Sequence, residues 1–146
     1  MKQSELITAA LKGDATLVVK NARVVNVFTN EILEGDVALS EDTIIGVGKG
    51  FAAREEIDAG GAYLCPGFID AHVHIESSMV IPDSFSRVIM PHGTTTIIAD
   101  PHEIANVCGV AGVRAIYKLS DDLPLRVLFM MPSCVPATPF ENSGAT

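Results

Sequence analysis

The stretch that decides the fold is Cys65–His74, with the sequence CPGFIDAHVH. Its β-branched and apolar residues behind Pro66 and Gly67 are typical of a strand. Alternate side chains of a strand point to opposite faces, and residues two apart are separated by roughly 6.6 Å. We therefore expect one face to be polar (Asp70, His72 and His74) and the other to be apolar (Ile69, Ala71, Val73 and Ile75). A wholly apolar second face predicts a buried strand, whose polar side chains need partners.

The two histidines of this strand are candidate ligands of one divalent ion. Imidazoles on one strand face can converge on an ion at about 2.0–2.1 Å from each nitrogen. The alternative is a histidine pair that shares hydrogen bonds in a core. The position of the pair, near the end of a buried strand and behind a β-rich leader, favours metal binding. The sequence thus predicts His72 and His74 as metal ligands.

Downstream of this strand, helical and extended patterns alternate. Helices are expected from Pro82 to about Met90 and from about Ile104 to Leu119, and strands over Thr95–Ala99 and Leu125–Met131. The second helix has apolar residues on one face at helical spacing (Ile104, Val107, Cys108, Ala111 and Ala115). Such alternation predicts an α/β protein with a parallel sheet.

Upstream, residues 1–65 have a different pattern, in which short β-branched runs replace the alternation of helices and strands. Ser4–Leu11 resembles a short helix that Gly13 ends. Short β-branched runs follow, separated by turn residues (Thr16–Lys20, Arg23–Phe28, Gly35–Leu39 and Thr43–Val47). This spacing predicts a small antiparallel sheet or half-sandwich.

A second polar cluster follows the later strands. Asp100, His102 and Glu103 come directly after the second strand of the βα region, and Pro132, Ser133 and Cys134 after the third. In βα barrels the active site forms at the carboxyl ends of the strands. Asp100, His102 and Glu103 are therefore candidates for binding a further metal or the substrate. The alternative is a helix start, where acidic side chains satisfy free backbone N–H groups.

Two residues after the histidine pair are weaker candidates. Glu76 and Ser77 could orient a substrate or a metal ligand, and ordinary loop solvation explains them nearly as well. Cys134 could be reactive, but a buried, inert thiol is the better interpretation.

The composition limits the range of partners. The chain has 146 residues, 48% of them hydrophobic, and a formal net charge of −8. Such a charge argues against nucleic-acid binding, which calls for clustered Lys and Arg. Three widely spaced cysteines fit a reducing compartment, and the longest apolar run is far too short for a membrane span. We expect a cytoplasmic protein with no membrane partner.

Several motifs together resemble a known family. Cys65–His74 is similar to the first-strand signature of the amidohydrolase superfamily, and the β-rich leader is similar to the small sandwich that precedes the barrel in some of its branches. Four further stretches resemble the bacterial adenine deaminase family: Ile75–Met79, His92–Thr96, Ala99–Val107 and Met131–Glu141. The resemblance runs from about Ala15 to the end of the chain.

The resemblance implies a fold and an activity. The fold is the start of an amidohydrolase (β/α)8 TIM barrel, with residues 66–146 as its first three β/α units, preceded by a small β-sandwich segment in residues 1–65. Eight units typically take about 250 residues, so the barrel would be incomplete. The activity is hydrolytic deamination of adenine to hypoxanthine and ammonia by a metal-activated water.

It also implies a cofactor. His72 and His74 would bind one ion of a binuclear site, with Mn²⁺ or Fe²⁺ expected and Zn²⁺ as an alternative. The other ligands and the catalytic acid/base would lie beyond Thr146, so this chain alone is expected to be inactive. Apart from the resemblance, the exposed edges of a partial barrel favour association, so the full-length protein is expected to be a homo-oligomer. The rival interpretations are another amidohydrolase, such as a cyclic-amide hydrolase or a deacetylase, and a non-catalytic module that binds metal or a partner.

Overall fold

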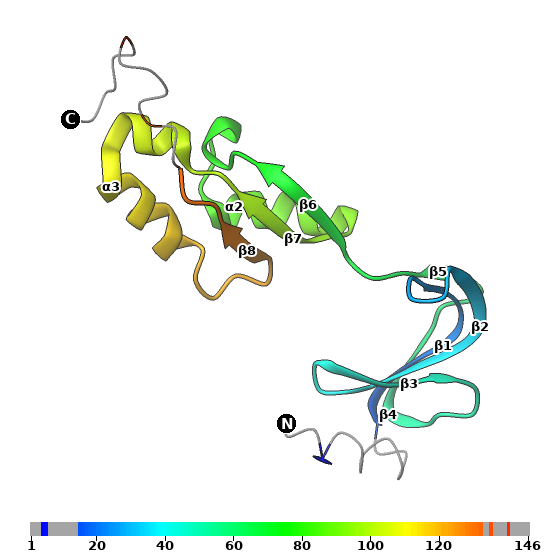
Figure 1. Ribbon diagram of the computed structural model, residues 1–146. Helices are drawn as coiled ribbons and strands as arrows, with labels where there is room; N and C mark the ends of the chain where they lie inside the picture. Colours follow the sequence, from blue (N-terminus) through cyan, green and yellow to red (C-terminus); the bar gives the residue numbers. More distant parts are fainter. Residues whose placement is uncertain (1–3, 6–14, 133–134, 136–139, 141–146) are drawn as a thin grey trace. The chain divides into compact units, whose positions relative to one another are not determined.

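The computed structural model describes residues 4–5, 15–132, 135 and 140. The chain divides into two compact units, Met1–Pro66 and Gly67–Thr146 (Figure 1). Most of the helix predicted over Ser4–Leu11 lies outside the described residues, as do Ser133 and Cys134. Among the described residues, no helix has the length and apolar character needed to cross a membrane.

The N-terminal unit is a mixed five-stranded sheet. Its strands are β1 (Ala15–Asn26), β2 (Glu31–Ser40), β3 (Thr43–Gly48), β4 (Ala53–Asp58) and β5 (Tyr63–Leu64). The order is β3-β2-β1-β4, and β5 also pairs with β1. The pairs β1–β2 and β2–β3 are antiparallel, whereas β4 and β5 run parallel to β1.

Two predictions for this unit are wrong. The expected strands Thr16–Lys20 and Arg23–Phe28 form the single strand β1, which passes through a bulge where Asn21 has a φ of 54°. The Asp36 carboxylate supports the bulge by accepting the Asn21 backbone N–H at 3.2 Å. The sheet is also mixed rather than antiparallel, because β4 and β5 run parallel to β1. The sequence pattern did not predict these two strands. The charged sequence of β4 lacks the apolar alternation that would have indicated a strand.

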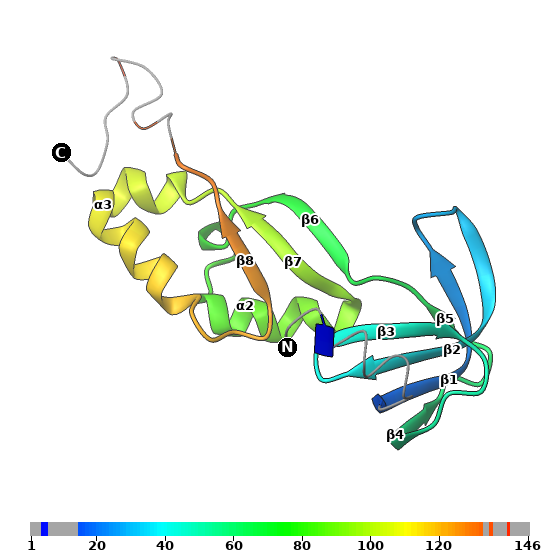
Figure 2. The ribbon, with the colours of Figure 1, turned by 60° about the horizontal axis from the view of Figure 1, so that its bottom comes forward.

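The C-terminal unit is a parallel three-stranded sheet with helical connections (Figures 1 and 2). Its strands, in spatial order, are β6 (Phe68–Val73), β7 (Thr94–Ala99) and β8 (Arg126–Phe129). The β6–β7 connection contains η1 (Glu76–Ser78), α2 (Pro82–Ile89) and η2 (Met90–His92), and α3 (His102–Leu119) joins β7 to β8. The predicted alternation of strands and helices is confirmed.

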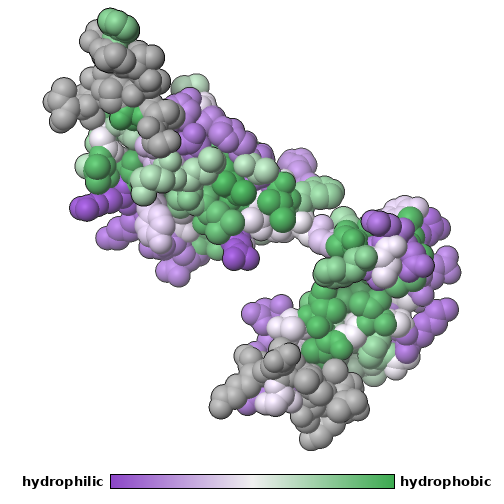
Figure 3. All heavy atoms as spheres, viewed as in Figure 1, coloured by the Kyte–Doolittle hydropathy of each residue, from purple (hydrophilic) through white to green (hydrophobic). Residues whose placement is uncertain are grey.

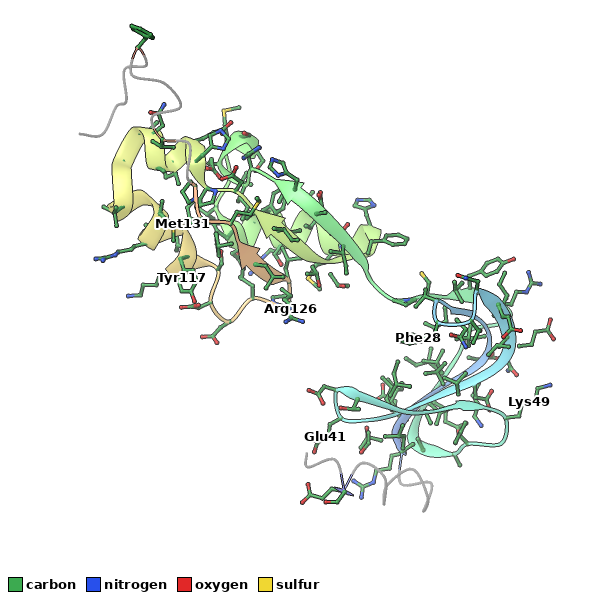
Figure 4. All side chains as sticks on the ribbon, in the orientation of Figure 1. Phe28, Glu41, Lys49, Tyr117, Arg126 and Met131 are labelled. Atoms are coloured by element: carbon green, nitrogen blue, oxygen red, sulfur yellow. The ribbon has the colours of Figure 1, made fainter. Side chains whose placement is uncertain are left out.

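One apolar core holds this unit together. Ile75, Ile97, Ala99 and Leu125 are almost fully buried, and Phe85 and Ile89 of α2 pack against them with other partly buried residues. Tyr117 of α3 contacts Phe129 of β8, with ring centroids 5.4 Å apart (Figure 4). Because Phe129 packs against the same core, α2 and α3 both cover the sheet face that carries Ile97 and Ala99.

The expected burial of the first βα strand is wrong for this chain. Phe68 and Ile69 of β6 are 58% and 66% exposed. The reason is that β6 is an edge strand, which pairs only with β7 among the described residues. Figure 3 shows hydrophobic side chains on the visible surface of this unit.

The predicted apolar face of α3 is also not its buried face. Val107 and Cys108 are exposed, whereas the buried residues are Ala105 and Gly112. Gly109 has φ 59° and ψ −150°, which interrupts the helix between its two halves. Val107 and Cys108 precede Gly109, so the interruption does not account for their exposure. The apolar spacing instead marks a face of α3 that the described residues leave uncovered.

Candidate metal centre

The two histidines of the first βα strand meet at its carboxyl end. β6 ends at Val73, and His72 Nε2 lies 3.1 Å from His74 Nε2. The rings are nearly perpendicular, with centroids 4.8 Å apart. Two ligand nitrogens at this separation, each about 2.05 Å from one ion, subtend an angle of about 98° at the ion, between the octahedral and tetrahedral values. The alternative is a hydrogen bond between the rings. It requires a proton on Nε2 of one histidine and a free lone pair on Nε2 of the other.

Asp100 completes a group of three candidate ligands. It follows β7, and its carboxylate lies with His72 and His74 so that the ligand atoms are all within 4.8 Å of one another. Among the described residues, Asp100 Oδ1 is buried without a hydrogen-bond donor. An unpaired buried carboxylate oxygen is costly, and a cation beside it would satisfy it. Histidine nitrogens with a carboxylate oxygen also form a usual donor set for a divalent transition metal, so the residues fit the expected ion.

The backbone around Asp100 orients one of the histidines. His74 Nδ1 lies 2.9 Å from the Asp100 carbonyl oxygen, and the Asp100 N–H donates to the Val73 carbonyl at 2.9 Å. If Nδ1 carries the proton, Nε2 has its lone pair free for an ion. Metal-binding histidines commonly use this arrangement, in which the second nitrogen donates to a carbonyl.

The remaining predicted residues surround this group. His102 Nδ1 lies 3.1 Å from Asp100 Oδ2, and its ring is edge-on to His74 at 4.6 Å. Ser77 Oγ donates to Glu103 Oε2 at 2.5 Å, and Glu76 Oε1 accepts the Ile104 N–H at 3.1 Å. The structure thus brings all seven predicted residues to the carboxyl ends of β6 and β7. Only His72, His74 and Asp100 belong to the group of candidate ligands.

Asp70 was expected to share the polar face of the histidines and does not join them. Its Oδ1 accepts the His72 backbone N–H at 3.1 Å. The β6–β7 pairing is irregular between Asp70 and Val73, so the simple alternation of faces fails there. A local sequence pattern carries no signal of such an irregularity.

Fold and geometry together define an α/β protein with a candidate metal site at the ends of neighbouring parallel strands. Residues 63–146 match the model of the amidohydrolase family. The chain therefore belongs to the amidohydrolase family.

The chain is similar to curated adenine deaminases over almost its whole length. It is 54% identical over 142 residues to the adenine deaminase of Geobacillus kaustophilus, covering 97% of this chain and 24% of that protein. It is 57% identical over 132 residues to the enzyme of Clostridium acetobutylicum, covering 90% of this chain and 23% of that protein. The chain thus spans about a quarter of the length of these relatives.

Two solved structures resemble this chain. One is N-acyl-D-glutamate deacylase from Bordetella bronchiseptica, complexed with zinc and a phosphonate inhibitor; it has a TM-score of 0.50 and 25% identity over 59% of this chain and 18% of that chain. The other is a mutant atrazine chlorohydrolase from Arthrobacter aurescens with zinc and atraton. Its TM-score is 0.62, with 19% identity over 80% of this chain and 35% of that chain, which supports the fold alone. Both of these proteins bind zinc in their crystals.

Proposed function

We propose that this chain is part of an adenine deaminase, which converts adenine and water to hypoxanthine and ammonia. The observation that carries the proposal is the group of His72, His74 and Asp100, which lies at the strand ends of a chain 54% identical to an adenine deaminase. The similarity includes both units, since the match covers 97% of the chain. A shared metal-binding strand alone would not distinguish adenine deaminases from other amidohydrolases.

In this proposal the described residues form the first half of the metal centre. His72 and His74 would hold one ion through Nε2, with Asp100 as the third candidate ligand. A divalent ion bound there would lower the pKa of water towards neutrality, which is the chemistry that attack on C6 of the purine needs. His74 is kept in the binding tautomer by the Asp100 carbonyl, and His102 holds the second oxygen of the Asp100 carboxylate. We expect a binuclear centre with Mn²⁺ or Fe²⁺, and Zn²⁺ as the alternative.

We further propose that β6, β7 and β8 are the first three strands of a (β/α)8 barrel. The parallel order and the helices on one sheet face support this proposal. So does the exposed β6 edge, because in a closed barrel a further strand pairs with the first one. Residues 1–65 would then be the small β domain that precedes the barrel in the sequence. We also propose that the full-length enzyme is a cytoplasmic homo-oligomer.

Substrate turnover by the full-length, Mn²⁺-loaded protein tests the proposed function. Ammonia release should be observed with adenine, and no product with a dihydropyrimidine or an N-acetylated amino sugar. These two compounds are substrates of the rival enzyme classes, the cyclic-amide hydrolases and the deacetylases. Turnover of either one in preference to adenine would replace the proposal with that activity.

A further inference from the structure

The first turn of α3 is held by a residue that lies far from it in the sequence. The N-cap position is Pro101, which makes no side-chain capping hydrogen bond. The Ile104 N–H instead donates to Oε1 of Glu76 in η1, 28 positions earlier, at 3.1 Å. A carboxylate at this place satisfies a free N–H group and also interacts favourably with the helix dipole. Glu76 therefore serves as an N-cap supplied by another segment.

A second contact joins the same two segments. Ser77 Oγ donates to Oε2 of Glu103, which lies in the first turn of α3. Two adjacent residues of η1 thus bind two adjacent residues of α3. This double contact restricts both the position and the direction of the first helical turn relative to the end of β6.

The first turn of α3 in turn orients the candidate ligand Asp100. His102 is the first residue of α3, and its Nδ1 lies 3.1 Å from Asp100 Oδ2. The Asp100 backbone is already fixed by Val73 and His74, so its side-chain direction is the remaining freedom. With Oδ2 engaged by His102, Oδ1 is left as the buried oxygen without a donor among the described residues.

We propose that Glu76 is a positioning residue of the metal centre: it holds the first turn of α3 so that His102 keeps the Asp100 carboxylate turned towards His72 and His74. The role requires a hydrogen-bond acceptor at position 76 rather than a metal ligand, since Oε1 is engaged by Ile104 and Glu76 lies outside the ligand group. This inference rests on the proposed metal site.

Mn²⁺ affinity of the full-length protein, measured by isothermal titration calorimetry, tests the inference. Glu76→Ala removes the acceptor and should weaken Mn²⁺ binding about tenfold, as expected for outer groups that orient ligands. Glu76→Gln keeps an acceptor oxygen and should remain within about threefold of the wild type. Asp83→Ala, which removes the acid from the first turn of α2, is the matched control and should leave the affinity unchanged.

A double-mutant cycle with Asp100→Asn separates positioning from a general loss of stability. If Glu76 acts through Asp100, the effect of Glu76→Ala should largely disappear in the Asp100→Asn background. Wild-type affinity in Glu76→Ala, an equal loss in Glu76→Gln, or full additivity with Asp100→Asn would each overturn the inference while leaving the metal site intact. Absence of Mn²⁺ binding by the wild type, or binding unaffected by His72→Ala, would overturn the proposed Mn²⁺ site as well, whereas the turnover assay tests the proposed function separately.

Discussion

At the scale of single residues, the carboxylates of the two units have different surroundings. Asp36 accepts backbone N–H groups from Asn21 and Gly50, one on each oxygen. Asp100, by contrast, has a buried Oδ1 without a donor among the described residues. A buried acceptor left unpaired costs about 1–3 kcal/mol. The hydrogen bonds of the fold therefore account for the Asp36 carboxylate, whereas the unpaired oxygen of Asp100 fits the proposed cation.

Asp58 provides a test of hydrogen bonding in the N-terminal unit. Hydrogen bonds from the Asn21 side chain and the Gly60 N–H lower the pKa of Asp58 from its ordinary value of 3.8. Asn21→Gly removes the side-chain donor and still permits the positive φ of the bulge. The titration midpoint of Asp58, followed by carboxyl carbon NMR, should rise towards 3.8 in this variant.

The sign of the stability effect follows from the direction of this shift. Because the folded state has the lower pKa, the charged carboxylate stabilises it above pH 3.8, and this contribution is lost as the pH falls through the folded pKa. Asn21→Gly should therefore lose less stability on acidification through this range than the wild type. An unchanged Asp58 midpoint would show that the Asn21 bond does not form in solution.

At the scale of elements, the sequence predicted those helix and strand positions that depend on neighbouring residues. The strand that contains His72, the helix start at Pro82 and the helix end near Leu119 follow from the apolar run, proline and periodicity. The mixed sheet was not predictable in this way, because the pairing of β1 with β4 depends on residues about 38 positions apart, such as Ala15 and Ala53. Likewise, a sequence motif could not predict the hydrogen bond between Glu76 and Ile104, because these residues are 28 positions apart.

The interruption of α3 at Gly109 leads to a testable prediction about the stability of this helix. Its φ of 59° and ψ of −150° lie in a region that is essentially restricted to glycine. Gly109→Ala should lower the free energy of unfolding of the full-length protein by about 1–3 kcal/mol, measured by urea titration.

Gly48→Ala is the control for this substitution. A Cβ at position 48 would meet only Phe51, at an ordinary 3.6 Å, so the change should stay within about 0.5 kcal/mol. A stabilising Gly109→Ala variant would mean that α3 is not interrupted at Gly109 in solution.

At the scale of the whole molecule, the described residues supply part of the proposed metal centre. They contribute His72, His74 and Asp100, and the chain spans about a quarter of its curated relatives. The sequence predicted that these residues lie near one another, because the carboxyl ends of adjacent parallel strands meet at one sheet edge. Their role as ligands stays a prediction. Which of the seven residues would approach an ion depended on side-chain contacts that only the structure supplies.

The 146-residue chain alone should release no ammonia from adenine. Our proposal places the remaining ligands and the acid/base group in other parts of the full-length enzyme. A coupled ammonia assay with the purified, Mn²⁺-loaded chain, run beside the full-length protein, checks this expectation. Turnover by the short chain would mean that its own residues complete the catalytic site.

Metal content of the full-length protein tests the central claim most directly. Inductively coupled plasma mass spectrometry should find bound divalent metal in the wild type and a clear loss in His72→Ala and in His74→Ala. His92→Ala is the matched control, since His92 lies in η2 and outside the ligand group, and it should retain the wild-type content. Equal metal content in all four proteins, or none in the wild type, would contradict the assignment of His72 and His74 as metal ligands.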